Sequence, residues 1–240
     1  MGGEITNMHH VLNIFGDSIM KGVLLDEATQ KYILSSNAPG DEVAKNMNID
    51  VFNRSVFGCT VVKGAKLVSS AIEKGRVGGD GLVLIEYGGN DCNYEWKDVS
   101  EFPESVHDPV TPLKQFENLY SNLIDGIKKA GITPVIMSLP PVEPSRYLAW
   151  ITKDGLSAEN ILKWLGDVNM IYRFQELYSN AISKIAYKTN SLFIDVRSYF
   201  LDKHNYGELL CADGIHPNRE GQKLISEALI DFYKSSAATA

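Results

Sequence analysis

Five short apolar runs, separated by longer amphipathic stretches, constrain the fold of this chain most strongly. Several of these runs are continuously apolar rather than alternating, which is typical of strands covered on both faces. Strands that alternate with helices form a parallel sheet flanked by those helices. We therefore predict an α/β fold of three layers, α/β/α, whose five-stranded parallel sheet is built from Val11–Phe15, Ile49–Asn53, Leu82–Tyr87, Thr133–Ser138 and Leu192–Val196.

Three long segments carry apolar residues at helical spacing and supply candidates for the outer layers. The first begins near Pro112 and ends at Gly131, residue types favoured at a helix start and just past a helix end. The second runs from Met170 to Ile185, and the third begins near Asn218. Because each has one apolar face, we expect all three to pack against the sheet.

The length and composition suit one compact domain over residues 1–240. We expect residues 1–10 and 235–240 to be frayed ends. The net charge is −7, and the 23 lysines and arginines are scattered without a basic stripe. A nucleic-acid partner is therefore not expected. The sequence leaves the oligomeric state open.

The chain also lacks the signals of a membrane or metal-binding protein. No apolar run approaches the roughly 18 residues of a membrane span, so none is expected. The first residues show neither the basic nor the apolar region of a secretion signal, which predicts a cytoplasmic protein. The three cysteines, Cys59, Cys92 and Cys211, show no paired spacing. We therefore predict neither a disulfide framework nor a metal site.

Two short motifs at opposite ends of the chain indicate nucleophilic catalysis. Residues 16–18 (Gly-Asp-Ser) directly follow the first apolar run, so that Ser18 is presented at a junction between a strand and a loop. Near the other end, Asp213 precedes His216 by three residues, close enough to share one tight loop. Such an aspartate accepts a hydrogen bond from the imidazole Nδ1, which leaves Nε2 to take a proton from serine. Together the motifs predict a serine hydrolase.

Two further segments complete a resemblance to the GDSL, or SGNH, hydrolase superfamily of esterases and lipases. Residues 53–60 (Asn-Arg-Ser-Val-Phe-Gly-Cys-Thr) are similar to the second sequence block of that family. Residues 88–91 (Gly-Gly-Asn-Asp) match the Gly-x-Asn-Asp of its third block. The four blocks occur in family order, and the likeness extends from about Val11 to Phe232. At the signature itself, Ile19 replaces the usual leucine, which is a conservative departure.

The resemblance implies a flavodoxin-like fold, a carboxylic ester hydrolase, and roles for particular residues. Ser18, His216 and Asp213 match the catalytic triad. The oxyanion hole is implied to consist of the backbone N–H groups of Ser18 and Gly58 and the side chain of Asn90. The resemblance implies no cofactor and no metal.

Each of these residues also has a purely structural interpretation. Ser18 is a favoured residue at a helix start. Asp213 with its following glycine is a strong turn signal, and Gly58 supplies a positive φ. Asn90 is compatible with an ordinary turn. His107 is the competing candidate base, but it lacks an acid at matching spacing, and a surface histidine is the better interpretation.

Two stretches, Cys92–Val110 and Pro140–Val168, are too long for plain connections and are rich in aromatic residues. We predict that they form the mouth of the substrate pocket, with Trp96, Trp150 and Trp164 as candidate pocket residues. The alternative is that these side chains form a packed satellite cluster.

The sequence says least about the substrate. We favour a small-molecule ester with a short acyl group on a carbohydrate or another small polar alcohol. One alternative is a lysophospholipase or thioesterase that accepts longer acyl chains. Another is a carbohydrate-binding protein that keeps the fold without turnover, although Ser18, Asn90 and His216 are all present.

Overall fold

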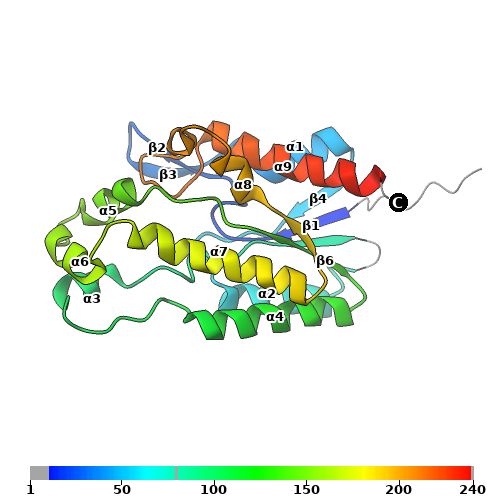
Figure 1. The fold of residues 1–240 in the computed structure, drawn as a ribbon. Helices are drawn as coiled ribbons and strands as arrows, with labels where there is room; N and C mark the ends of the chain where they lie inside the picture. Colours follow the sequence, from blue (N-terminus) through cyan, green and yellow to red (C-terminus); the bar gives the residue numbers. More distant parts are fainter. Residues whose placement is uncertain (1–10, 79–80, 239–240) are drawn as a thin grey trace, which may run out of the picture.

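The computed structural model describes residues 11–78 and 81–238, and its centre is a five-stranded sheet (Figure 1). All neighbouring strands in this sheet are parallel, and their order is β4-β1-β5-β6-β7. The predicted sheet is confirmed, and each strand lies within the apolar run predicted for it. The strands are β1 (Val11–Phe15), β4 (Asp50–Asn53), β5 (Leu82–Ile85), β6 (Thr133–Met137) and β7 (Leu192–Ile194).

Helices cover both faces of the sheet, with α1 and α9 above the strands and α2 and α4 below them in Figure 1. Successive strand residues point to opposite faces. Leu12 and Ile14 therefore join the core beneath α1, α8 and α9, whereas Phe15 joins the core with α2, α4 and α7. The predicted three-layer arrangement is confirmed. The helices are α1 (Pro39–Met47), α2 (Val61–Glu73), α4 (Leu113–Lys129), α7 (Met170–Lys188), α8 (Val196–Leu201) and α9 (Arg219–Ala238).

The strand order creates one topological switch point. Counting only the five parallel strands, the order is 2-1-3-4-5, in which the chain winds in opposite directions from the first strand, β1. In such a sheet the crevice for a ligand lies outside the carboxyl ends of the strands where the order reverses. Here that point lies between β1 and β5. The loops that follow these two strands begin at Gly16 and Glu86.

Three of the sheet strands, β5, β6 and β7, end earlier than the apolar runs predict. β5 ends at Ile85, although the N–H of Glu86 still donates to the carbonyl of Phe15 (3.0 Å). The chain then leaves the sheet through Gly88, whose φ of +138° is outside the strand range. Likewise β7 ends at Ile194, because the next residue is the N-cap of α8. After β5 the chain stays buried, because Glu86 and Tyr87 are both inaccessible to solvent.

A two-stranded antiparallel hairpin next to the main sheet was not predicted from the sequence. It consists of β2 (Val23–Asp26) and β3 (Lys31–Leu34). The connection between them is polar and lacks the Asn-Gly or Asp-Gly pair that signals a tight hairpin turn. Gln30 instead takes the positive φ (55°) that the turn requires.

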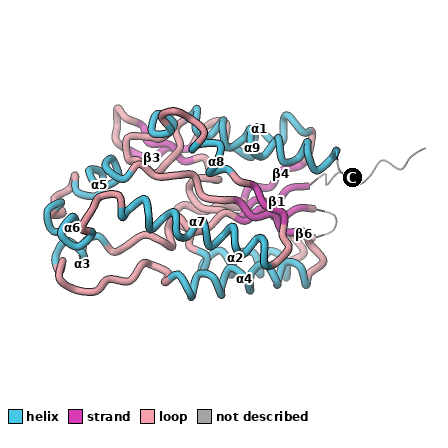
Figure 2. The backbone as a smooth tube through the Cα atoms, viewed as in Figure 1, coloured by secondary structure: helices cyan, strands magenta, loops and turns pink. Residues whose placement is uncertain are grey.

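The two long aromatic stretches fold into short helices that pack together as a cap at one end of the molecule (Figure 2). The stretches contribute α3 (Trp96–Glu101), α5 (Pro144–Thr152) and α6 (Ala158–Leu165). Ser100 joins two of these helices, because its Oγ accepts from the N–H of Ser157 (2.8 Å) and its carbonyl accepts from Nδ2 of Asn160 (2.7 Å). The cap has an apolar core of its own.

The carboxyl end of the chain differs from its predicted frayed tail. Helix α9 continues to Ala238, so residues 235–238 are helical, while the predicted frayed residues 1–10 and 239–240 lie outside the described part. A short 3-10 helix, η1 (Tyr206–Leu209), precedes the last loop. Among the described helices, none combines the length and the hydropathy needed to cross a membrane.

Two helical glycines give a matched test of the packing. A Cβ at Gly64 on α2 would lie 2.3 Å from Cζ of Tyr87, whereas a Cβ at exposed Gly126 on α4 meets no atom within 4 Å. We expect Gly64→Ala to lower the free energy of unfolding by about 1–3 kcal/mol through overpacking. Gly126→Ala should raise it by about 0.5–1 kcal/mol. Thermal unfolding measures both, and a raised Tm for Gly64→Ala would contradict the predicted packing.

Candidate active site

The two ends of the chain meet in a continuous chain of hydrogen bonds. Ser18 follows β1, and Asp213 and His216 lie in the loop before α9. The distance from Nε2 of His216 to Oγ of Ser18 is 2.9 Å, and Nδ1 of His216 lies 2.6 Å from Oδ2 of Asp213. All three side chains are buried. Residues that are 198 positions apart in sequence are thus joined in one hydrogen-bond chain, as the predicted triad requires.

The loop that carries Asp213 is fixed by that carboxylate. Oδ1 accepts hydrogen bonds from the backbone N–H groups of Ile215 and His216, each at 3.1 Å. Burial would raise the pKa of Asp213, but these bonds and the neighbouring imidazole outweigh it, and the pKa lies below its ordinary value. Gly214 has φ of +74°, and a Cβ there would lie 2.6 Å from the carbonyl of Glu143. Asp213 is therefore both a turn residue and the partner of His216.

Backbone N–H groups of two predicted oxyanion residues have no acceptor among the described residues. They belong to Ser18 and Gly58. Gly58 is exposed and has φ of +65°, a conformation that glycine adopts without strain. These N–H groups are available to a ligand that carries a negative charge near Ser18.

The Asn90 side chain is anchored by the residue next to Ser18. Its Nδ2 donates to Oδ2 of Asp17 at 2.8 Å and to the carbonyl of Cys59 at 3.3 Å. Asp17 is itself held, because its Oδ1 accepts from the N–H of Ile19 at 2.8 Å. The orientation of the Asn90 amide therefore depends on the Asp17 carboxylate. The sequence predicts the position of Asn90 at the site but not this anchor.

A second buried carboxyl group lies beneath Asp17. Oε2 of Glu86 accepts from the N–H of Asp17 at 3.1 Å, while Oε1 has no partner among the described residues. Burial and the charge of Asp17 raise the pKa of Glu86 well above its ordinary value. Burial also raises the pKa of Asp17, but the Ile19 N–H, the His216 imidazole and the Asn90 amide favour its charged form. We therefore assign the proton to Glu86 and the charge to Asp17.

Asp91 joins the loop after β5 to the start of helix α2. Its two carboxylate oxygens accept from the N–H of Val61, the first residue of α2, at 3.1 and 3.0 Å. A carboxylate is favoured at this end of a helix. Burial raises the pKa of Asp91 to about 6. This contact holds the segment that carries Gly58 against the segment that carries Asn90.

A largely apolar cavity opens beside Ser18 and His216 and extends beneath the cap. The space within it that the centre of a water-sized sphere can occupy is about 90 Å³. The polar residues that line it include Asn90 and Glu86, and also Asn93 and Gln175. Its apolar walls include Tyr94, Trp96, Leu139, Val142, Ile171 and Phe174.

The three predicted pocket tryptophans occupy different places. Trp96 lines the cavity, whereas Trp150 and Trp164 are not among the described residues that line it. Trp164 lies behind the wall, with its ring 4.9 Å from that of Tyr94, and belongs to the core of the cap. Trp164 therefore fits the alternative interpretation, in which these aromatic side chains form a packed cluster and not a pocket wall. Trp150 lies elsewhere, with its ring 5.9 Å from that of Tyr32 on β3.

The remaining candidates lie away from the hydrogen-bond chain or are buried. Nε2 of His107 is 2.9 Å from the carbonyl of Phe102, within the cap. The three cysteines are unbonded to one another and buried. Burial raises the pKa of Cys59 to about 11 and that of Cys211 above its ordinary value. In the described part of the chain, no group of three or more His, Cys, Asp or Glu side chains is arranged to hold a metal ion.

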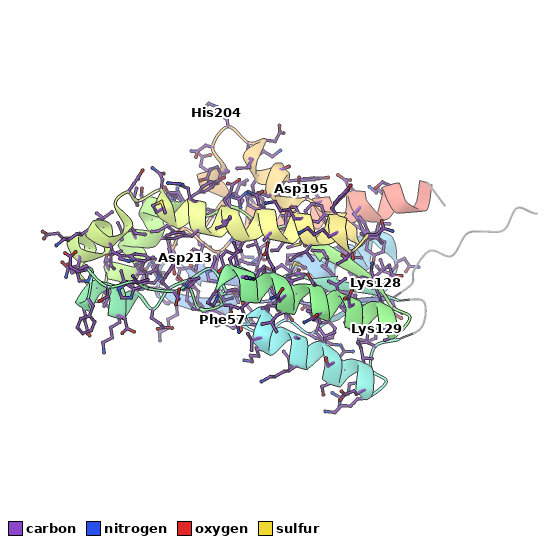
Figure 3. The ribbon with its side chains drawn as sticks, turned by 60° about the horizontal axis from the view of Figure 1, so that its bottom comes forward. Phe57, Lys128, Lys129, Asp195, His204 and Asp213 are labelled. Atoms are coloured by element: carbon purple, nitrogen blue, oxygen red, sulfur yellow. The ribbon has the colours of Figure 1, made fainter. Side chains whose placement is uncertain are left out.

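Figure 3 places these features along the molecule. Asp213 and Phe57 lie toward the cap, while Lys128 and Lys129 mark the opposite end, where α4 finishes. The candidate site is therefore at the carboxyl ends of the strands, where the switch point predicts it.

The protonated state of Glu86 predicts a pH-dependent stability difference. Above about pH 4.3, an unfolded-state glutamic acid loses the proton that the folded state retains, so the stability of the native protein falls as the pH rises toward the folded-state pKa. Glu86→Gln has the same shape and cannot ionise. We expect the Tm of Glu86→Gln to rise relative to that of the unmodified protein as the pH increases above about 4.3. The exposed Glu73→Gln is the matched control. Parallel Tm curves for the Glu86→Gln variant and the unmodified protein would show that Glu86 is charged in the fold.

Comparison with known proteins places this geometry in a family. The profile of the GDSL-like Lipase/Acylhydrolase family matches residues 14–224. No curated protein matches the chain. Similar solved structures include a lipase/acylhydrolase from Enterococcus faecalis, with 17% identity, a TM-score of 0.64 and coverage of 94% of this chain and 96% of that one. A catalytic mutant of Axe2, an acetylxylan esterase from Geobacillus stearothermophilus, has 18% identity, a TM-score of 0.64 and 96% coverage of both chains.

At these identities the solved structures establish the fold alone, which the chain shares over nearly its full length. The family match rests on the sequence itself and covers most of the chain, from the end of β1 into α9. It includes the Gly-Asp-Ser motif, both oxyanion segments and the Asp213–His216 loop. The chain belongs to the GDSL-like lipase/acylhydrolase family and is a carboxylic ester hydrolase.

Proposed function

We propose that the chain hydrolyses its ester through an acyl-enzyme on Ser18, with His216 as the general base and acid and Asp213 as its orienting partner. The observation that carries this proposal is the unbroken hydrogen-bond chain from Oδ2 of Asp213 to Oγ of Ser18 at the wall of a cavity. A serine hydroxyl is a weak nucleophile until an adjacent base accepts its proton. Here the base lies at hydrogen-bond distance and its other nitrogen is held by a buried carboxylate.

The proposed reaction proceeds in two halves. Oγ of Ser18 attacks the acyl carbon while Nε2 of His216 takes the proton, and the carboxylate of Asp213 stabilises the imidazolium. His216 then gives the proton to the departing alkoxide, which leaves as the alcohol. A water molecule attacks the acyl-enzyme by the same route, and the carboxylic acid and Ser18 are released.

The charge that develops on the carbonyl oxygen needs preorganised donors. We assign this role to the N–H groups of Ser18 and Gly58 and to the amide of Asn90. Nδ2 of Asn90 donates one hydrogen to the carboxylate of Asp17 and makes a longer contact, of 3.3 Å, to the carbonyl of Cys59. An oxyanion would replace the carbonyl of Cys59 as the acceptor of the second hydrogen. Removal of one such donor typically costs about 3 kcal/mol of transition-state stabilisation.

The cavity favours an acyl group longer than acetyl. Its apolar walls gain free energy only when an apolar group displaces water, at about 0.8 kcal/mol for each buried CH₂. The sequence alone favoured short acyl groups, and the likeness to an acetylxylan esterase supports that alternative. The contact between Ser18 and His216 argues against a binding protein without turnover.

The nucleophile assignment predicts the effect of a single substitution. Ser18→Ala should remove nearly all esterase activity, because base and nucleophile act as one unit. It should also abolish labelling by a fluorophosphonate, while the circular dichroism spectrum and Tm stay close to those of the unmodified protein. Substantial turnover by the purified, folded variant would rule out Ser18 as the nucleophile.

The acyl cavity predicts a change in chain-length preference. Ile171 on α7 lines the cavity and is buried, whereas Leu177 on the same helix is exposed. Ile171→Phe should lower kcat/KM for hexanoyl and octanoyl esters by about tenfold while sparing the acetyl ester of the same alcohol. Leu177→Phe is the matched control and should leave the profile unchanged. If Ile171→Phe lowered activity on all chain lengths equally, the acyl chain would lie elsewhere.

A further inference from the structure

We propose that three aromatic side chains, two of them beside His216, form the subsite for the alcohol portion of the ester and select an alcohol that carries a ring. These residues, Tyr32, Phe57 and Trp150, are called the aromatic rim below. The inference rests on the proposed function, because it assigns the leaving group of that reaction. It concerns the alcohol portion of the ester, which the acyl cavity does not select.

The position of the leaving group follows from the general acid. The leaving oxygen must come within hydrogen-bond reach of Nε2 of His216 to receive its proton. The aromatic rings closest to that imidazole are those of Tyr32, with a centroid distance of 4.9 Å, and Phe57, at 6.2 Å. The Phe57 ring is also stacked with the imidazole, at an interplanar angle of 16°. A bulky alcohol bonded to the leaving oxygen therefore passes the aromatic rim.

The aromatic rim is separate from the acyl cavity. None of its three side chains is among the described residues that line that cavity, although His216 borders both. The rim residues come from three different parts of the fold: strand β3, the loop after β4, and helix α5. Their rings contact one another in series, with Tyr32 5.5 Å from Phe57 and 5.9 Å from Trp150. The acyl and alcohol portions of an ester thus meet two different surfaces.

The exposure of Phe57 and Tyr32 points to a ligand rather than to a role in folding, whereas Trp150 is partly buried against the core of Leu24, Leu25 and Cys211. Phe57 is 48% exposed and Tyr32 is 37% exposed, in direct contact with each other. Contiguous exposed apolar surface beside a cavity is characteristic of ligand-binding sites. Phe57 also precedes Gly58, whose backbone N–H has no partner among the described residues. The chain therefore places an uncovered aromatic ring one residue away from a proposed oxyanion donor.

The arrangement of the rings favours a ring-shaped alcohol over an extended alkyl chain. Tyr32 is tilted by 50° from Phe57 and by 57° from Trp150, so the rim presents separate flat faces rather than a continuous groove. A flat face makes most contact with another flat, apolar face, such as that of an aryl group or the CH face of a sugar ring. The hydroxyl of Tyr32 stays neutral, because burial and the Asp213 carboxylate raise its pKa.

The test compares esters that share one acyl group and differ in the alcohol. Butanoyl esters of benzyl alcohol and of a methyl pyranoside represent the two kinds of ring, and ethyl butanoate represents an alcohol without one. The ratio kcat/KM reports the steps through acylation, in which the alcohol departs. We expect Phe57→Ala to lower kcat/KM for one or both ring esters by roughly tenfold, with little change for ethyl butanoate. Tyr32→Ala should lower kcat/KM for the ring esters more than for ethyl butanoate. The ring ester with the larger loss identifies the kind of alcohol.

Two further variants separate the rim from the triad. Tyr32→Phe keeps the ring and should keep the preference for ring alcohols, even if loss of the hydroxyl beside Asp213 slows all substrates. Tyr187→Ala removes an exposed tyrosine from α7, which contributes no residue to the rim. This control should leave kcat/KM unchanged for the ring esters and for ethyl butanoate. A second readout is transfer of the butanoyl group from the enzyme to added alcohols, since an acceptor alcohol binds where the leaving alcohol binds. Benzyl alcohol should compete with water better than ethanol does, and Phe57→Ala should remove that advantage.

Several results would overturn the inference while leaving the hydrolase assignment intact. One is an equal loss for ring and ethyl esters in Phe57→Ala and Tyr32→Ala, which would make these residues supports of the triad. Another is a changed acyl chain-length profile with an unchanged alcohol preference, which would place the acyl group on the rim. An active Ser18→Ala variant, by contrast, would remove the proposed function itself.

Discussion

The site depends on how helix α9 is held against the amino-terminal half of the chain. Ile225 and Leu229 of α9 pack in the same apolar core as Ile14 of β1. Nε2 of Gln222 donates to the carbonyl of Val23 at 3.1 Å, in a buried contact just after the Ser18 loop. A buried polar bond of this kind fixes register, because a shift would leave both groups unpaired. The loop that ends at α9 therefore carries His216 to one defined place above Ser18.

Within that frame, buried carboxyl groups set the directions of the reacting side chains. A buried charge is tolerated only where hydrogen bonds compensate it. Asp213 is compensated by the imidazole and two backbone N–H groups, which fix the ring of His216. Asp17 is compensated by the Ile19 N–H and the Asn90 amide. The same bonds that make each charge tolerable also orient a group for catalysis, so little reorganisation remains when the transition state forms.

The sequence predicts those parts of the protein that depend on local pattern. The strands and the Asp213–His216 turn follow from apolar runs and from residues three positions apart. Other features depend on contacts between distant segments. Glu86 looks like one polar residue in an apolar strand, and its role appears only when Asp17 is placed above it. Tyr32 lies in a hairpin without a turn signal, and its place beside His216 comes from tertiary packing. The same holds for Trp150 and Trp164. Both lie in the same aromatic stretch of the sequence, but the fold places one ring against Tyr32 and the other against Tyr94.

Helix α5 connects the two proposed substrate surfaces. Its first turn is fixed to the Asp213 loop, because the N–H of Glu143 donates to the carbonyl of Gly214 at 2.8 Å and no side chain fits at Gly214. One turn further on, Tyr147 lines the acyl cavity, and Trp150 reaches the aromatic rim three residues later. Residues three apart on a helix are neighbours on its surface. A displacement of α5 would therefore move a wall of the cavity, a ring of the rim and the loop of His216 together, which ties acyl and alcohol selection to the geometry of the triad.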